Sequence, residues 1–174
     1  MKISLELIKQ LRETTSVSIS DCKKALQEAQ GDIQKAVELL RMRGLEIAAK
    51  KQDRAAKEGR IEAYVHQGNK IGVLLEVDCE TDFAARNNEF CQFTKDIAMQ
   101  IAACNPRYIK KEDVPAQLIE REKDKEPFLK DNCLLEQAFI KDPNITIKDY
   151  LGSLIAKIGE NILIRRFVRY KIGE

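Results

Sequence analysis

The sequence lacks most of the residues from which catalytic and metal sites are built. It has no tryptophan and a single histidine, His66, among 174 residues. A catalytic triad needs a base oriented by a carboxylate and directed at a nucleophile, and this imidazole has no such pattern nearby. The chain also contains no Walker A sequence, no G-x-G-x-x-G and no H-E-x-x-H. We therefore expect no enzyme, no metal and no cofactor.

A strong charge bias and long apolar runs are missing as well. The 30 basic and 28 acidic side chains give a net charge of +2, and basic doublets such as Lys110-Lys111 are short. This balance requires neither nucleic acid nor a membrane as a partner. The apolar runs IGVLLEV and LGSLIAKIG are far shorter than a bilayer span, and the start MKISLELIKQ lacks a signal-peptide core. We expect a cytoplasmic protein.

The cysteines do not form a recognisable framework. There are five of them, with no C-x-x-C pair and no nearby histidine that would complete a zinc site. We expect free thiols, most of them buried.

The first fifty residues have the pattern of three short helices. Ser18 and Asp21 form a capping box ahead of apolar residues spaced at i, i+3, i+4 and i+7, and Gly31 follows them. Asp32 is positioned to cap the next helix, which Gly44 would end. The short connections predict a three-helix bundle.

A composition change marks a domain boundary after this bundle. The stretch Glu46–Gly59, EIAAKKQDRAAKEG, is charged, rich in alanine and without an apolar stripe, which is typical of a solvated helical linker. We place the boundary near Arg54, giving a helical domain of residues 1–54 and a second domain of residues 55–174.

The second domain mixes strands and helices. Residues 61–65 alternate, Gly68-Asn69 supplies a two-residue hairpin turn, and IGVLLEVDC continues as a second strand. Apolar residues at helical spacing follow in residues 90–101, and Thr146 and Asp149 begin a later helix with another capping box. These elements predict an α+β fold. In the last strand, strict alternation would place four residues on one face: Ile162, Ile164, Val168 and Tyr170.

The junction Thr81-Asp82-Phe83 has an unusual residue for its position. A phenylalanine stands where a buried strand passes into a helix, and such junctions normally carry small polar residues. In one interpretation Thr81 or Asp82 caps the helix and Phe83 packs back on the core as a hydrophobic staple. In the other, Phe83 is a wedge that enters a partner protein.

Four motifs resemble those of one family. DCKKAL, GDI-x-x-A, LLEVDCETDFAARNNEF and IAKIGENI-x-IRR occur in the order found in elongation factor Ts of bacteria and organelles, over essentially the whole chain. The resemblance implies a guanine-nucleotide exchange factor for elongation factor Tu, with an N-terminal bundle like the ubiquitin-associated domain.

The resemblance also implies the contact residues. Thr81, Asp82, Phe83 and Ala84, the last where many relatives have valine, would disturb the magnesium site of elongation factor Tu. Lys9, Arg12 and Ile19 would be the N-terminal contacts. Longer family members have a duplicated core, whereas short forms like this one pair as homodimers.

Two other classes of function are compatible with the residues. One is an adaptor that binds a partner through its helical bundle alone. The other is a ribosome-associated or RNA-binding protein without exchange activity, whose binding would weaken steeply with added salt.

Overall fold

The chain begins with the three helices that the sequence predicts. The computed structural model describes residues 3–15 and 17–174, and its first helices are α1 (Leu5–Thr15), α2 (Ile19–Glu28) and α3 (Ile33–Lys51). The side chains of Ser18 and Asp32 accept hydrogen bonds from the first turns of α2 and α3, so both predicted caps are confirmed. The core of this bundle consists of small and branched apolar residues: Ile8, Leu11, Cys22, Ala25, Leu26, Ala29, Ala36 and Leu40.

Helix α3 is longer than predicted, because Gly44 does not end it. Gly44 lies inside the helix and faces Gly152 of α8 (Ile147–Ile158); a Cβ built on Gly152 would be 3.4 Å from the carbonyl carbon of Gly44. The missing side chains let the two backbones approach closely. The prediction of a solvated linker from Glu46 onward is therefore wrong for its first half. There Ile47 and Ala48 pack on the core of the rest of the chain.

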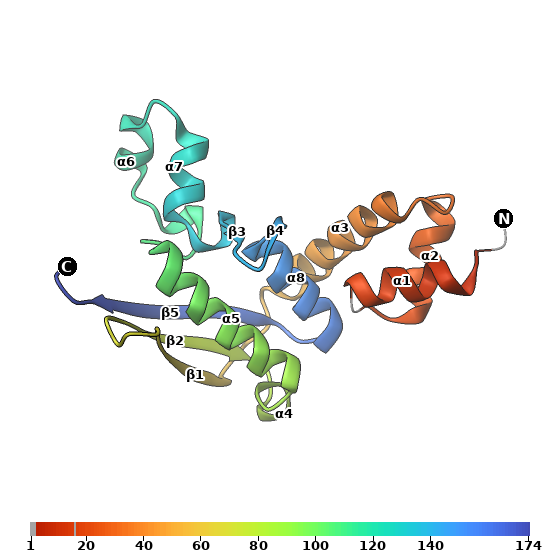
Figure 1. Cartoon of the computed structure of the whole chain (residues 1–174), viewed down its shortest axis with the longest axis horizontal. Helices are drawn as coiled ribbons and strands as arrows, with labels where there is room; N and C mark the ends of the chain where they lie inside the picture. The colour runs from red at the N-terminus through yellow and green to blue at the C-terminus, as the bar shows by residue number, and fades with distance from the viewer. Residues whose placement is uncertain (1–2, 16) are drawn as a thin grey trace.

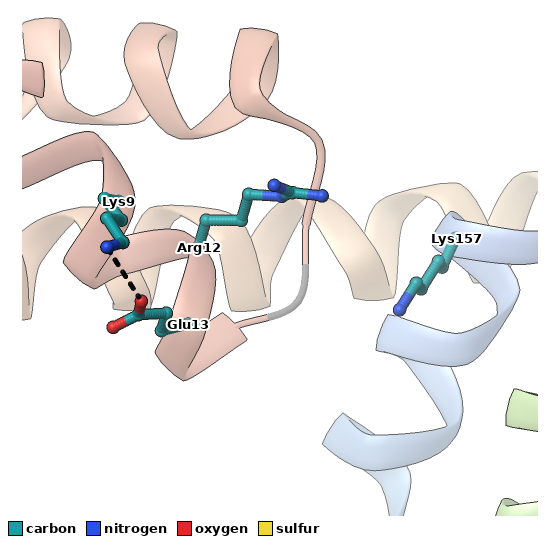
Figure 2. Close-up of a pocket in the computed structure, with 4 residues that line it drawn as sticks. All are labelled: Lys9, Arg12, Glu13 and Lys157. Carbon is teal, nitrogen blue, oxygen red and sulfur yellow. Dashed lines mark ion pairs between the residues drawn. The ribbon is translucent and has the colours of Figure 1, made fainter.

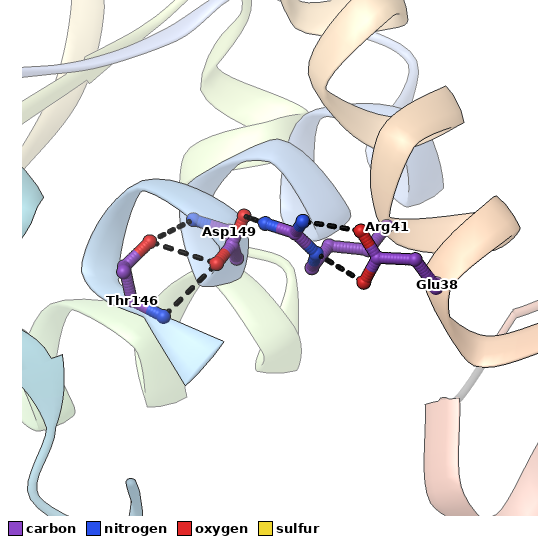
Figure 3. Close-up of polar contacts among 4 residues, drawn as sticks. All are labelled: Glu38, Arg41, Thr146 and Asp149. Carbon is purple, nitrogen blue, oxygen red and sulfur yellow. Dashed lines mark hydrogen bonds and ion pairs between the residues drawn. The ribbon is translucent and has the colours of Figure 1, made fainter. Parts of the chain in front are cut away.

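A partly buried ion pair also joins α3 to α8 (Figure 3). Arg41 Nη1 donates to Asp149 Oδ1 at 2.8 Å, and Asp149 is almost fully buried. The other carboxylate oxygen accepts from the N–H and the hydroxyl of Thr146, which confirms the predicted capping box of α8. Arg41 also donates to Glu38, and this hydrogen bond lowers the pKa of the Glu38 carboxyl. The bundle is thus attached to the following elements through the second half of α3.

We expect Gly152→Val to weaken this attachment. The new side chain would lie 3.2 Å from Leu45 Cδ2, so α3 and α8 must move apart, at a cost of about 1–3 kcal/mol in the free energy of unfolding. The control is Ser153→Val, which makes the same residue on the exposed side of α8 and should change stability by no more than about 0.5 kcal/mol. Thermal or urea unfolding measures both. Equal stability of the two variants would contradict the close helix contact.

The strands form a three-stranded antiparallel sheet in the order β1-β2-β5. Its strands are β1 (Glu58–Val65), β2 (Ile71–Cys79) and β5 (Ile162–Lys171). The predicted hairpin between β1 and β2 is present, and Gly68 and Asn69 both have positive φ. Its loop is longer than the two residues expected, because the His66 N–H pairs with the Ile71 carbonyl and leaves four residues between them.

A β-bulge in β5 overturns the face prediction for that strand. Arg166 lies opposite Glu76 and Ile164 lies opposite Val77, so Arg165 is an extra residue. One extra residue reverses the alternation of side chains beyond it. Ile162 and Ile164 are therefore buried, whereas Val168 and Tyr170 point to the opposite, exposed face.

One face of the sheet is covered and the other is open (Figure 1). Helix α5 (Asn88–Cys104) crosses the covered face, following the short α4 (Asp82–Ala85), and α8 packs beside it. The predicted apolar stripe of α5 is confirmed, since Phe90, Phe93, Ile97 and Ile101 are fully buried. The open face carries exposed apolar side chains from all three strands: Ile61, Val65, Leu74, Val168 and Tyr170.

The charged segment of residues 107–132 forms an arm that projects from one end of the molecule (Figure 1). It contains the 3-10 turn η1 (Lys111–Asp113), α6 (Ala116–Arg121) and α7 (Lys125–Asn132). The turn η2 (Leu134–Glu136) and a small sheet of β3 (Ala138–Phe139) and β4 (Asp142–Thr146) lead on to α8. In the part of the chain that the structure describes, eight α-helices and two small antiparallel sheets confirm the predicted α+β class. Among the described residues, no helix is both long and apolar enough to cross a bilayer.

Candidate functional site

The motif Thr81-Asp82-Phe83 lies at the junction between β2 and α4. Thr81 is extended and its hydroxyl oxygen accepts a hydrogen bond of 3.3 Å from the Ala84 N–H, so it is the N-cap of α4. A threonine in this position satisfies a donor that the first turn of a helix leaves free. The cap interpretation of Thr81 therefore holds, and it leaves the role of Phe83 to be decided separately.

The Phe83 side chain projects into solvent from a turn whose next residues are buried. Phe83 is 81% exposed, while the next two residues, Ala84 and Ala85, belong to the core cluster. A hydrophobic staple would bury the ring against the core, and this ring is not buried. A large apolar side chain held out from a packed turn is available to a partner. Ala84 is not at the surface, so its part in the site is to anchor the turn.

Asp82 is also accessible, although it has an ion pair. Its carboxylate lies 3.1 Å from Arg86 Nη2, one helical turn further on; the Arg86 side chain is largely in solvent and the Asp82 side chain is about half exposed. Exposed pairs of this spacing contribute only about 0.3–0.5 kcal/mol. The Asp82 carboxylate can therefore exchange Arg86 for another cation at little cost.

Glu160 holds this junction in place by hydrogen bonds, and no local sequence pattern singles it out. Its Oε2 accepts from the Glu80 N–H at 3.1 Å and from the Thr81 N–H at 3.0 Å. Its Oε1 accepts from the Thr81 hydroxyl at 2.7 Å. The motif IGEN signals the turn after α8, and Gly159 does end that helix with φ +82°. What the motif cannot signal is a partner some eighty residues earlier in the chain.

Cys79 adds a further contact to the same junction. Its Sγ lies 3.1 Å from the Thr81 carbonyl oxygen, to which the thiol donates. Burial, followed by the negative charge of Glu160, raises the pKa of the Cys79 thiol to about 11. The thiol therefore keeps its proton near neutral pH and remains a donor. Thr81 is held through its N–H, its carbonyl and its hydroxyl.

The predicted N-terminal contacts Lys9 and Arg12 line a shallow groove between α1 and α8 (Figure 2). The groove has a volume of about 300 Å³, and its other lining residues are Glu13 and Lys157. Lys9 Nζ is 4.0 Å from Glu13 Oε1. Three of the four lining side chains are cationic, which suits an acidic segment of a partner. Ile19, the third predicted residue, is exposed at the start of α2 and does not line this groove.

The groove and the Phe83 junction meet at the C-terminal end of α8. Lys157 lines the groove and also pairs with Glu89, in the first turn of α5 just after the motif. Glu160, three residues beyond Lys157, binds Thr81. A single partner could therefore touch both the bundle and the exposed ring.

Other residues offer little for catalysis. His66 is exposed, and its Nδ1 is 3.0 Å from the hydroxyl of Tyr64, two residues earlier in the chain. Within residues 3–15 and 17–174, no group of three His, Cys, Asp or Glu side chains is arranged to hold a metal ion. Five cysteines are free, and three of them are buried: Cys22, Cys79 and Cys133.

Comparison with known proteins gives a consistent result over the whole chain. Residues 2–127 and 124–174 match the family model described as Elongation factor TS. The chain is 51% identical to Elongation factor Ts of Carboxydothermus hydrogenoformans over 195 residues, covering 99% of this chain and 90% of the relative. It is 50% identical to Elongation factor Ts of Fervidobacterium nodosum over 197 residues, covering 100% of both.

The alignments with these relatives are longer than the chain. The alignments extend over 195 and 197 positions, so the relatives carry residues that this 174-residue chain does not have. The two matched segments overlap at residues 124–127, at the start of α7.

Proposed function

This chain belongs to the elongation factor Ts family and is a translation elongation factor; we propose that it binds elongation factor Tu and promotes the exchange of its GDP for GTP. The observation that carries the proposal is the exposed Phe83 ring on a turn that is fixed by hydrogen bonds and core packing. The place of action is the cytoplasm. The protein itself makes and breaks no covalent bond.

The proposed mechanism is a thermodynamic linkage. A protein that binds the nucleotide-free GTPase more tightly than the GDP-magnesium form must weaken nucleotide binding by the same factor. Phe83 would fill an apolar gap that opens only when a neighbouring segment of the GTPase moves. Asp82 would bring negative charge toward a site that binds phosphate and magnesium, while Thr81 and Ala84 hold the turn in place.

Two parts of the chain would share the contact with the GTPase. Residues 1–54 would hold the GTPase through Lys9, Arg12 and Ile19, and residues 55–174 would carry the wedge. The cationic groove suits an acidic surface on the partner. The extension of α3 onto α8 supports a fixed separation between these two contacts, because the helices are joined by the Arg41–Asp149 pair.

We further propose that the protein is a homodimer that pairs through the open face of the sheet. Ile61 and Val65 are each 63% exposed there and Tyr170 is 73% exposed, so the face is an apolar patch of the kind that marks an interface. Across the three strands of this face, Gly72 of β2 lies between Val65 of β1 and Tyr170 of β5. A hollow of about 300 Å³ opens beside Gly72.

The same face is suited to a second copy of itself. A two-fold interface must be self-complementary, so it needs projections and hollows, and charges of both signs, on one surface. The Tyr170 ring and the hollow at Gly72 satisfy the first need. Glu76 and Arg166, which pair across β2 and β5 on this face, satisfy the second.

The central test is the release of labelled GDP from elongation factor Tu. We expect substoichiometric amounts of the protein to accelerate release, and the isolated chain to bind no GDP. The adaptor alternative predicts binding to the GTPase with an unchanged release rate. The RNA-binding alternative predicts RNA binding that falls steeply between low and moderate salt. Tight GDP binding by the chain alone, or no acceleration at equimolar amounts, would reject exchange activity.

A further inference from the structure

The turn that carries Phe83 has little stability of its own. Helix α4 has four residues, which is too short to persist without contacts from outside it. Its one side-chain cap is the Thr81 hydroxyl, which accepts from the Ala84 N–H. The direction in which the ring projects therefore depends on what holds Thr81.

Glu160 meets that requirement with both carboxylate oxygens. The N–H groups of Glu80 and Thr81 follow the end of β2, and both donate to Oε2. The Thr81 hydroxyl donates to Oε1 and at the same time accepts from Ala84, so it joins the carboxylate to the first turn of α4. Hydrogen bonds to a charged acceptor are about twice as strong as neutral ones.

The chain around Glu160 is fixed by hydrogen bonds of the neighbouring residue, Asn161. The Asn161 N–H donates to Glu80 Oε1 at 2.6 Å, so the Glu80 and Glu160 side chains each bind the other's segment. The Asn161 amide donates to the carbonyls of Gln52 and Arg54, at 3.3 and 2.7 Å, in the connection that follows α3. Asn161 is almost fully buried. The support for Thr81 is thus tied to the end of the helical bundle.

We propose that Glu160 is a positioning residue for Phe83: its carboxylate fixes the direction in which the ring is presented to the partner. This inference rests on the proposed exchange function. Glu160 acts through Thr81. Removing its carboxylate should therefore leave the Phe83 ring present but change the direction in which the ring projects. Misplacement of this kind is costly, since a shift of about 1 Å in a functional group can reduce a rate by up to about 100-fold.

A double-mutant cycle tests the inference. We expect Glu160→Ala to lower the GDP release rate roughly 10-fold, and Glu160→Gln, which keeps one acceptor oxygen, to lower it less. In a Phe83→Ala background, Glu160→Ala should have less than about a 2-fold further effect, because the ring that it positions is gone. The control Glu126→Ala makes the same substitution at an exposed carboxylate on α7, which is paired with Lys130, and should leave the GDP release rate unchanged.

A merely structural role for Glu160 gives a different result. Loss of folding stability, or a direct contact between Glu160 and the partner, would reduce GDP release by the same factor with and without Phe83. Equal factors in the two backgrounds would therefore overturn the positioning role. The thermal midpoint, in contrast, should fall by the same amount in both backgrounds.

Amide hydrogen exchange tests the positioning role of Glu160 separately from the proposed nucleotide-exchange function. In the free protein, the N–H groups of Glu80 and Thr81 should exchange faster in Glu160→Ala than in the wild type, with Glu126→Ala unchanged. Unchanged hydrogen exchange at these two amides would reject the positioning role even if the wild-type protein accelerates GDP release from elongation factor Tu normally. Absence of GDP release with the wild-type protein would instead reject the proposed function.

Discussion

Phe83→Ala is expected to reduce the GDP release rate about 30- to 150-fold while leaving the fold of the free protein intact. The reduction corresponds to roughly 2–3 kcal/mol, the usual cost of removing a buried aromatic anchor from an interface. The thermal midpoint should barely change, because the side chain is 81% exposed and contributes little to folding. An exchange assay and a thermal melt on the same preparation measure both quantities.

A second phenylalanine provides the matched control. Phe93 is fully buried in α5 and packs edge-to-face on Tyr150, with ring centroids 5.0 Å apart. We expect Phe93→Ala to lower the free energy of unfolding by about 3–5 kcal/mol. Its release rate per folded molecule should stay near the wild-type value. A large drop in the melting temperature of Phe83→Ala, with release per folded molecule unchanged, would reject the wedge.

Asp82→Ala should have a milder effect on GDP release than Phe83→Ala. The contribution of Asp82 is electrostatic and screened by salt, and its carboxylate already has a cationic neighbour in Arg86. Comparing the two variants at low and moderate ionic strength separates the roles. The Asp82→Ala defect should shrink as salt is added, whereas the Phe83→Ala defect should persist.

Leu74→Lys is expected to convert the proposed dimer into monomers. Leu74 lies in the middle strand on the open face, between Ala63 and Val168. A dimer would bury two copies of the new ammonium group without a partner, which is strongly unfavourable. We expect the dissociation constant to rise by at least about 100-fold, since the cost is several kcal/mol. Sedimentation equilibrium over a range of concentrations measures this change.

The control for this experiment makes the same substitution elsewhere. Leu118 on α6 is 38% exposed, close to the 47% of Leu74, but it lies in the projecting arm. Leu118→Lys should leave the dissociation constant unchanged. Both variants should keep the helical signal of the folded monomer, since neither side chain is in the core. A wild-type protein that stays monomeric at high micromolar concentration, or a Leu74→Lys protein that still dimerises, would contradict pairing through the sheet.

The sequence by itself determined the type of each main element, the fold class and the family. Helix starts are encoded within a few residues: a hydroxyl or carboxylate that caps, followed by apolar residues at helical spacing. The caps at Ser18, Asp32 and Thr146 are therefore where the sequence predicts them. A phenylalanine in a polar junction is unusual, and an exposed Phe83 is therefore one of the two interpretations that the sequence allows.

Only the tertiary structure decided where these elements end, which way they face and what supports them. Gly44 has the appearance of a helix stop, yet contact with Gly152 makes it part of a longer helix. One extra residue at Arg165 turns Val168 and Tyr170 to the open face of the sheet. Glu160 reaches Thr81 only because α8 ends beside β2. Each of these outcomes depends either on contacts between residues about eighty or more positions apart or on a one-residue shift of strand register. The local spacing of residues in the sequence carries information on neither.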